Sequence, residues 1–171
     1  ISDEPGVLLM LRFADCTPVW MYDPVHRAIG LAHAGWRGTA AGTVRETVRA
    51  MALSFGTRPR DVVAGIGPAI GPCCYEVGRD VADAVRQAMP DEGQLLRAQA
   101  GSGASVGDDS DAERHWHLDL WTANRAQLVQ TGVQCVEVAG LCTACHVDEW
   151  FSHRAERGRT GRLGALIGLQ G

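Results

Sequence analysis

The pattern of apolar and polar positions divides the chain into short β-favouring runs and longer segments with helical spacing. The apolar runs predict strands at residues 7–13, 18–22, 28–34, 62–66, 134–138 and 163–169. Helical spacing predicts a helix over residues 39–55, which Gly56 ends, a second around residues 81–89, and a third from Asp119, as its N-cap, to about residue 131. This alternation predicts an α/β or α+β fold built as a layered sandwich.

The spacing of these segments also predicts how the chain is organised. Residues 101–113 are rich in Gly, Ser and Asp, which predicts a surface loop between the second and third helices. The 171 residues contain no internal repeat, so we expect a single domain over residues 1–171. Because the chain begins at Ile1, its natural start is expected to lie upstream.

Composition and charge exclude several classes of function. The net charge of −4 provides no broad cationic field, so nucleic acid is not an expected partner. No apolar run approaches the ~20 residues that cross a bilayer, so no membrane partner is expected either. All 16 basic residues are Arg, which excludes a Walker A lysine and Schiff-base chemistry.

The turn between the second and third predicted strands carries the most informative chemistry. Asp23-Pro24 has the composition of a type I turn. If Pro24 and Val25 are the two central turn residues, Cys16 lies directly opposite His33 across a hairpin. Directly opposed Cβ atoms lie about 4.5–5.5 Å apart, close enough for a thiolate and an imidazole to share one zinc ion. A bulge near Pro18 would shift this register by one residue.

Spacing alone leaves a structural alternative open for both residues. Cys16 is then a small buried apolar side chain, and His33 is a core histidine bonded to backbone.

The other cysteines lie in two groups. Cys73 and Cys74 are adjacent, and Cys142 and Cys145 form a C-x-x-C-H match to a c-type haem motif, which requires export. A chain of this size favours reduced thiols in the cytoplasm, which argues against haem. A structural zinc site formed by Cys142, Cys145 and His153 lacks a second cysteine pair at a suitable spacing.

Several longer motifs resemble those of the laccase-domain family, also called the multicopper polyphenol oxidase or peptidoglycan-editing-factor family. They are ADCTP at residues 14–18, AHAGWRGT at 32–39, GIGPAIGPCCYEV at 65–77, HLDL at 117–120 with Asn124, CT at 142–143, FSHR at 151–154 and TGR at 160–162. They follow the family's order and cover most of the chain.

The resemblance implies a four-layered α/β/β/α sandwich with mixed sheets and one catalytic zinc. It implies phosphorolysis of adenosine, inosine and methylthioadenosine, and deamination of adenosine, with purine nucleosides and phosphate as partners. Cys16 and His33 match two of the family's zinc ligands. The family's first zinc-binding histidine lies upstream of ADC, in a segment that this sequence lacks. We therefore expect either that the chain is truncated at its N-terminus or that a partner supplies that ligand.

Two further residues are candidates for binding substrate. Arg37 follows the His33 strand just before a helix, and a guanidinium beside a helix N-terminus suits phosphate. Structural bonds from Arg37 to backbone carbonyls are the alternative. Asn124, early in the third helix, is expected to help shape the pocket.

Two other hypotheses about the function of the whole chain stay open. Copper-dependent oxidation of phenols fits poorly with six scattered histidines, although copper also enters zinc sites. Alternatively, a chain that lacks the family's first zinc-binding histidine is a non-catalytic interaction domain.

Overall fold

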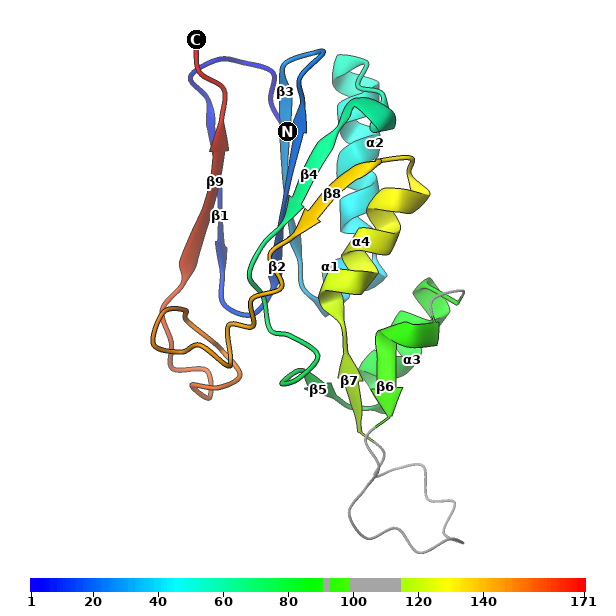
Figure 1. The fold of residues 1–171 in the computed structure, drawn as a ribbon, viewed down its shortest axis with the longest axis vertical. Coiled ribbons are helices and arrows are strands. Elements are labelled where there is room, and N and C mark those ends of the chain that lie inside the picture. Colours follow the sequence, from blue (N-terminus) through cyan, green and yellow to red (C-terminus); the bar gives the residue numbers. More distant parts are fainter. Residues whose placement is uncertain (91–92, 99–114) are drawn as a thin grey trace, which may run out of the picture.

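The computed structural model describes residues 1–90, 93–98 and 115–171 (Figure 1). The polar loop predicted at residues 101–113 lies outside the described residues.

A four-stranded sheet forms the centre of the molecule. Its strand order is β3 (Ala28–Ala34), β2 (Thr17–Asp23), β4 (Val63–Ile66) and β8 (Cys135–Val138). The β3–β2 and β2–β4 pairs are antiparallel, whereas β4 and β8 are parallel. The sheet is therefore mixed, as predicted.

Two smaller sheets complete the strand structure. β1 (Leu8–Phe13) pairs antiparallel with β9 (Leu163–Gly168), so the first and last strands of the chain lie side by side (Figure 1). The third sheet has the order β5 (Glu76–Val77), β7 (Trp116–Leu118) and β6 (Leu96–Ala98). The apolar pattern did not predict this sheet because its strands are only two or three residues long.

Helices at residues 43–55 and 120–130 cover one face of the four-stranded sheet, and β1 and β9 lie on its other side (Figure 1). α2 (Thr43–Phe55) and α4 (Leu120–Gln130) pack there, with Val48, Met51 and Leu128 fully buried against Val19 and Met21. A second core lies between α3 (Arg79–Ala88) and the three-stranded sheet. The mixed α+β class is confirmed, whereas the four-layered arrangement stays a prediction.

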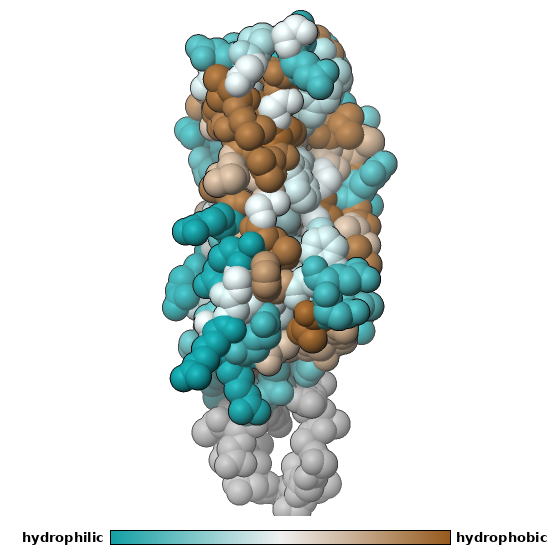
Figure 2. Space-filling model, turned by 90° about the vertical axis from the view of Figure 1, so that its left-hand side faces the viewer, coloured by the Kyte–Doolittle hydropathy of each residue, from teal (hydrophilic) through white to brown (hydrophobic). Residues whose placement is uncertain are grey.

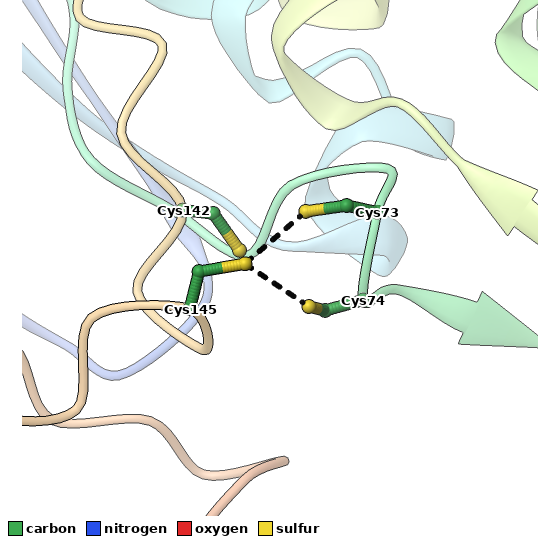
Figure 3. Close-up of side chains that lie close together, drawn as sticks. All are labelled: Cys73, Cys74, Cys142 and Cys145. Carbon is green, nitrogen blue, oxygen red and sulfur yellow. Dashed lines mark hydrogen bonds between the residues drawn. The ribbon is translucent and has the colours of Figure 1, made fainter.

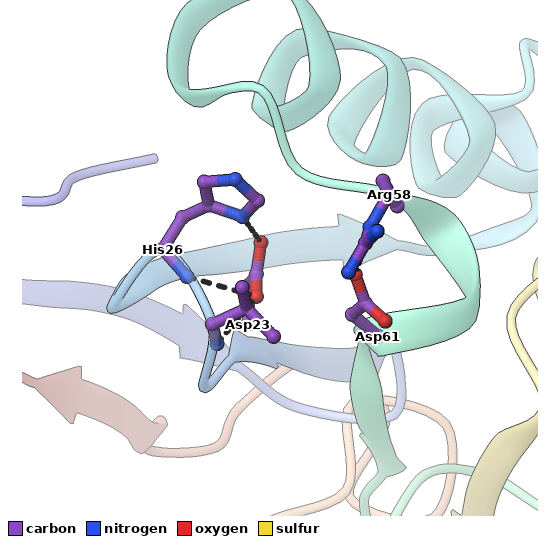
Figure 4. A network of polar contacts seen from close by, with 5 residues as sticks. Asp23, His26, Arg58 and Asp61 are labelled. Carbon is purple, nitrogen blue, oxygen red and sulfur yellow. Dashed lines mark hydrogen bonds and ion pairs between the residues drawn. The ribbon is translucent and has the colours of Figure 1, made fainter.

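The hairpin register differs from the predicted one. Pro18 pairs with His33, and Asp23 pairs with Ala28, so the loop contains four residues rather than two. Figure 4 shows the cause: Asp23 Oδ1 accepts bonds from the Val25 and His26 amides at 2.8 and 3.2 Å, and Oδ2 contacts His26 Nδ1 at 2.7 Å. This carboxylate stabilises a longer turn, and the direct opposition of Cys16 and His33 was therefore wrong.

The helix predicted over residues 39–55 is two helices. α1 (Trp36–Ala40) begins three residues earlier than predicted, and α2 begins after Gly42, whose φ of 74° interrupts the helical backbone. Gly56, with φ of 73°, ends α2 as predicted. Asp119 caps α4 as predicted, and its side chain accepts a bond from the Thr122 amide.

The outer face of β1 and β9 is apolar and exposed. Leu8 and Met10 are 59% and 58% exposed, and Leu166 from β9 lies opposite Met10. Figure 2 looks onto this side of the molecule and shows hydrophobic side chains gathered on its upper part. Among the described residues, no helix has the length and apolarity to span a membrane.

Candidate functional site

Cys16 lies just before β2, where the chain passes close to the end of β3. A Cβ atom added to Gly35 would lie 2.5 Å from Cys16 Sγ, so the thiol packs directly against the Gly35 backbone. His33 is two residues before Gly35 and pairs with Pro18. Strand alternation therefore makes Cys16 and His33 diagonal neighbours, a relationship in which Cα atoms lie about 7–8 Å apart. Their joint binding of one metal ion stays a prediction.

His33 is an exposed side chain, which excludes the core-histidine alternative. Its ring stacks on the buried Phe13 ring with centroids 4.4 Å apart. Partial burial against this ring lowers the pKa of His33, which favours the neutral imidazole that binds metals. Cys16 is half-buried, and its pKa is raised by burial and by the neighbouring Asp15 charge, while Arg162 opposes that rise.

Asp15 holds the segment before Cys16 in a fixed conformation. Its φ of 79° is left-handed, and its carboxylate accepts bonds from Thr143 Oγ1 at 2.7 Å and the Arg154 amide at 2.6 Å. Its carbonyl accepts a bond from the Ile70 amide at 2.9 Å. Three segments distant in sequence therefore converge on the residue beside Cys16. No role for Asp15 was predicted from the sequence, although this residue lies within the ADC motif.

Arginine side chains lie near the Cys16 thiol and the Tyr75 ring. Arg162 lies near enough to lower the pKa of Cys16, and Arg154 lies 5.3 Å from the centre of the Tyr75 ring. Burial raises the pKa of Tyr75 to about 12, the nearby Cys16 adds to this rise, and the Arg154 and Arg37 charges oppose it. Guanidinium groups therefore lie near both the phenol and the thiol, although burial keeps the pKa of each raised.

The two predicted substrate-binding residues have different environments. Arg37 is exposed on α1, with its guanidinium 4.4 Å from the centre of the Trp36 ring. Asn124 is fully buried: its Nδ2 donates to the Leu120 carbonyl at 2.8 Å, and its Oδ1 accepts a bond from Thr39 Oγ1 at 3.3 Å. These contacts link α4 to α1. A direct contact of Asn124 with substrate stays a prediction that this placement does not support.

A second group of metal-binding side chains consists of four cysteines from two loops, which we call the cysteine cluster: Cys73, Cys74, Cys142 and Cys145 (Figure 3). Their four Sγ atoms lie within 4.8 Å of one another. The prediction that Cys142 and Cys145 lack a second cysteine pair was wrong, because the fold brings in residues about 70 positions earlier. Only the C-x-x-C spacing and the adjacent cysteines signalled this cluster in the sequence.

The cluster is the one group of three or more metal-binding side chains found in the described parts of the chain. Cys16 and His33 therefore supply two donors, whereas a catalytic zinc site takes three protein ligands. These two donors, a soft thiolate and an imidazole, are of the kinds that bind zinc, and they account for two of the three protein ligands. The residues described do not complete that site by themselves.

These features describe an α+β domain with a half-buried thiol and an exposed imidazole at diagonal positions of one hairpin, and with arginines nearby. The family model for the multi-copper polyphenol oxidoreductase laccase matches residues 1–170. The chain belongs to this laccase-domain family.

Relatives and solved structures agree with that assignment. The chain is 43% identical over 169 residues to "Purine nucleoside phosphorylase YlmD" of Geobacillus stearothermophilus, covering 98% of this chain and 58% of that protein. A protein of the same name from Bacillus subtilis is 39% identical over 171 residues, covering 99% of this chain and 57% of its own length. The crystal structure of YlmD from Geobacillus stearothermophilus matches 99% of this chain and 59% of that chain, with 42% identity and a TM-score of 0.86. The chain thus spans less than two thirds of the length of these relatives.

Proposed function

We propose that this domain forms part of a zinc-dependent purine nucleoside phosphorylase. The observation that carries the proposal is the placement of the half-buried Cys16 thiol and the exposed His33 imidazole at diagonal positions of one hairpin, with arginines nearby. The reaction needs metal-binding side chains and basic groups that bind phosphate. The similarity of this chain to two bacterial proteins named purine nucleoside phosphorylase supports the proposal. The reduced thiols that the site requires fit a cytoplasmic protein.

The proposed reaction transfers the sugar from the purine to phosphate. A phosphate oxygen forms a bond to C1′ while the bond from C1′ to the purine nitrogen breaks, giving the free base and the sugar 1-phosphate. Arg37 is the proposed phosphate ligand, because its exposed guanidinium offers two parallel donors to phosphate oxygens. Asn124 supports this position indirectly, because it holds Thr39 in the same short helix.

Cys16 and His33 are the proposed zinc ligands of this chain, and the third ligand comes from outside the described residues. Zinc bound there supplies a Lewis acid to the bound nucleoside. The protein's own part is to orient the two donors through Asp15 and Phe13 and to attract the anion. Adenosine, inosine and methylthioadenosine are the proposed substrates. Adenosine deamination is proposed for the same site.

The test is turnover by the natural full-length protein, with adenosine, inosine and methylthioadenosine, in the presence and absence of phosphate. Phosphate-dependent release of free base and sugar 1-phosphate supports phosphorolysis, and phosphate-independent conversion of adenosine to inosine and ammonia supports deamination. His33→Ala should remove both activities. Arg37→Lys should mainly raise KM for phosphate, and an unchanged phosphate dependence would exclude its proposed role.

The same purified protein also tests the two other hypotheses, a polyphenol oxidase and a non-catalytic interaction domain. Oxygen consumption with phenols and bound copper would indicate a polyphenol oxidase. An intact folded protein without any of these activities would indicate an interaction domain.

A further inference from the structure

The cysteine cluster includes neither of the proposed catalytic donors, Cys16 and His33. Cys145 Sγ lies 3.5 Å from Cys73 Sγ and 3.4 Å from Cys74 Sγ. In a tetrahedral site with Zn–S bonds of about 2.3 Å, the sulfur atoms lie about 3.8 Å apart. Figure 3 shows side chains from the two loops pointing toward a common centre. The sulfur spacing therefore matches that of thiolates around a single ion.

We propose that Cys73, Cys74, Cys142 and Cys145 bind a structural zinc ion that is separate from the catalytic site. Four thiolates fill a tetrahedral shell and leave no position for water or substrate, which distinguishes structural from catalytic zinc. Zinc binding exchanges the thiol protons for the metal and needs no oxidant or reductant. Sulfur atoms this close together surround one ion and leave no room for a multi-iron cluster.

Backbone contacts hold both ligand loops in place. The Gly71 amide donates to Cys142 Sγ at 3.2 Å, a bond that supports a thiolate ligand. The Ala69 amide donates to the Leu141 carbonyl at 3.2 Å, and the Thr143 amide donates to the Ala69 carbonyl at 3.1 Å. The two loops are thus already joined beside the four sulfur atoms.

Close packing and a histidine fix the remaining parts of these loops. A Cβ atom on Gly71 would lie 2.8 Å from the Trp121 ring and 3.2 Å from Cys142 Cβ, so the backbone approaches both closely. His117 Nδ1 donates to the Pro72 carbonyl at 2.5 Å, directly before Cys73. This preorganisation reduces the conformational entropy lost when the ion binds.

The cluster has a direct connection to the proposed catalytic site. Thr143, between the two ligands of its loop, donates to Asp15, the neighbour of Cys16. Tyr75 directly follows Cys74 and lies near the Cys16 thiol. A zinc ion in the cluster would therefore fix two walls of the site around Cys16 without touching substrate.

The experiment measures metal content and cobalt spectra of the full chain, purified under reducing conditions. We expect zinc by mass spectrometry, and cobalt substitution should give the intense thiolate-to-metal absorption of a four-sulfur site. Cys145→Ser should lose one zinc equivalent and most of that absorption. Cys135→Ser is the matched control, since Cys135 is an exposed free cysteine outside the cluster. Cys16→Ser should keep the four-sulfur spectrum, which separates this proposal from the catalytic one.

A measurement on a chain that keeps all four cluster cysteines covers the case in which Cys145→Ser does not fold. Titration of the Cys16→Ser, Cys135→Ser double variant with a mercurial reagent, with a chromogenic chelator present, should release one zinc per chain as the four cluster thiols react. Iron in place of zinc, a disulfide within the cluster after reducing purification, or an unchanged cobalt spectrum in folded Cys145→Ser would each overturn the proposal.

Discussion

At the scale of single residues, the site depends on two backbone positions that the donors themselves do not reveal. Asp15 adopts a left-handed φ of 79°, and Gly35 leaves space for the Cys16 sulfur. Asp tolerates this conformation better than most residues because its short side chain bonds locally. The position of the Cys16 thiol is thus fixed by Asp15, which precedes it in the chain, and by Gly35, which follows β3.

Gly35→Ala should displace the Cys16 thiol. The new methyl group would lie 2.5 Å from Sγ, so the sulfur has to move away from its present position. We expect nucleoside turnover by the full-length protein to fall about tenfold or more, because positional errors of ~1 Å cost about 10²-fold in catalysis. Steady-state assays check this, with circular dichroism to confirm the fold. Gly93→Ala is the control, since nothing lies within 4 Å of its added Cβ; equal activity of both variants would contradict the prediction.

Asp15→Ala should destabilise the domain and loosen the loop that contains Thr143. The substitution removes the acceptor of the Thr143 hydroxyl and the Arg154 amide, and Thr143 is fully buried. We expect a loss of about 2–3 kcal/mol, or roughly 5–10 °C in Tm. Calorimetry measures it. Asp15→Asn keeps an acceptor for Thr143 and should recover part of the loss; no difference between the two variants would show that the hydroxyl bond is unimportant.

At the scale of elements, apolar periodicity predicted most strands and helices but not how distant segments meet. The strands at residues 28–34 and 163–169 and the cap at Asp119 follow from local pattern and are confirmed. The hairpin register depended on side-chain bonds of Asp23, which spacing cannot show. The cysteine cluster depends on pairing between loops about 70 residues apart, so neither loop alone predicts it. The joint role of Cys16 and His33 stays a prediction.

The short helix α1 is held from one side by two polar residues of α4, which gives a prediction at this scale. Gln127 Nε2 donates to the Thr39 carbonyl at 2.6 Å, and Asn124 accepts from the Thr39 hydroxyl. Asn124→Ala and Gln127→Ala should each cost about 1–3 kcal/mol, because each leaves a buried polar group without its partner. Both should also raise KM for phosphate, since α1 carries Arg37.

A comparison of the two variants decides between a structural and a direct role for Asn124. If Asn124 contacted substrate, only Asn124→Ala would change KM, and Gln127→Ala would affect stability alone. Thermal unfolding and phosphate-dependent kinetics of the full-length protein measure both effects. Arg125→Ala serves as a control on the exposed face of the same helix.

At the scale of the whole molecule, the loops at one end of the central sheet carry the residues of both proposed sites, and the β2–β3 turn lies at the opposite end (Figure 1). Asp23 is the last residue of β2 before that turn, and its side chain is fully buried. Burial alone would raise the pKa of Asp23. The nearby Thr57 hydroxyl, the His26 ring and the amides of His26 and Val25 outweigh burial and lower it. The turn is thereby a source of pH-dependent stability distant from the proposed chemistry.

The lowered pKa of Asp23 predicts the direction of that dependence. A carboxylate whose pKa is lower in the folded state stabilises the fold fully at pH values above its unfolded pKa of about 3.9, and this stabilisation is lost as the pH falls through the folded value. Asp23→Asn should therefore reduce stability at pH 7 and flatten the decline in Tm below about pH 4. Calorimetry across pH 3–7 tests this, and Asp148→Asn removes an exposed negative charge elsewhere as the control. An acid decline in Asp23→Asn as steep as in the unmodified chain would show that the turn carboxylate does not contribute, and the four-residue loop would then need another source of stability.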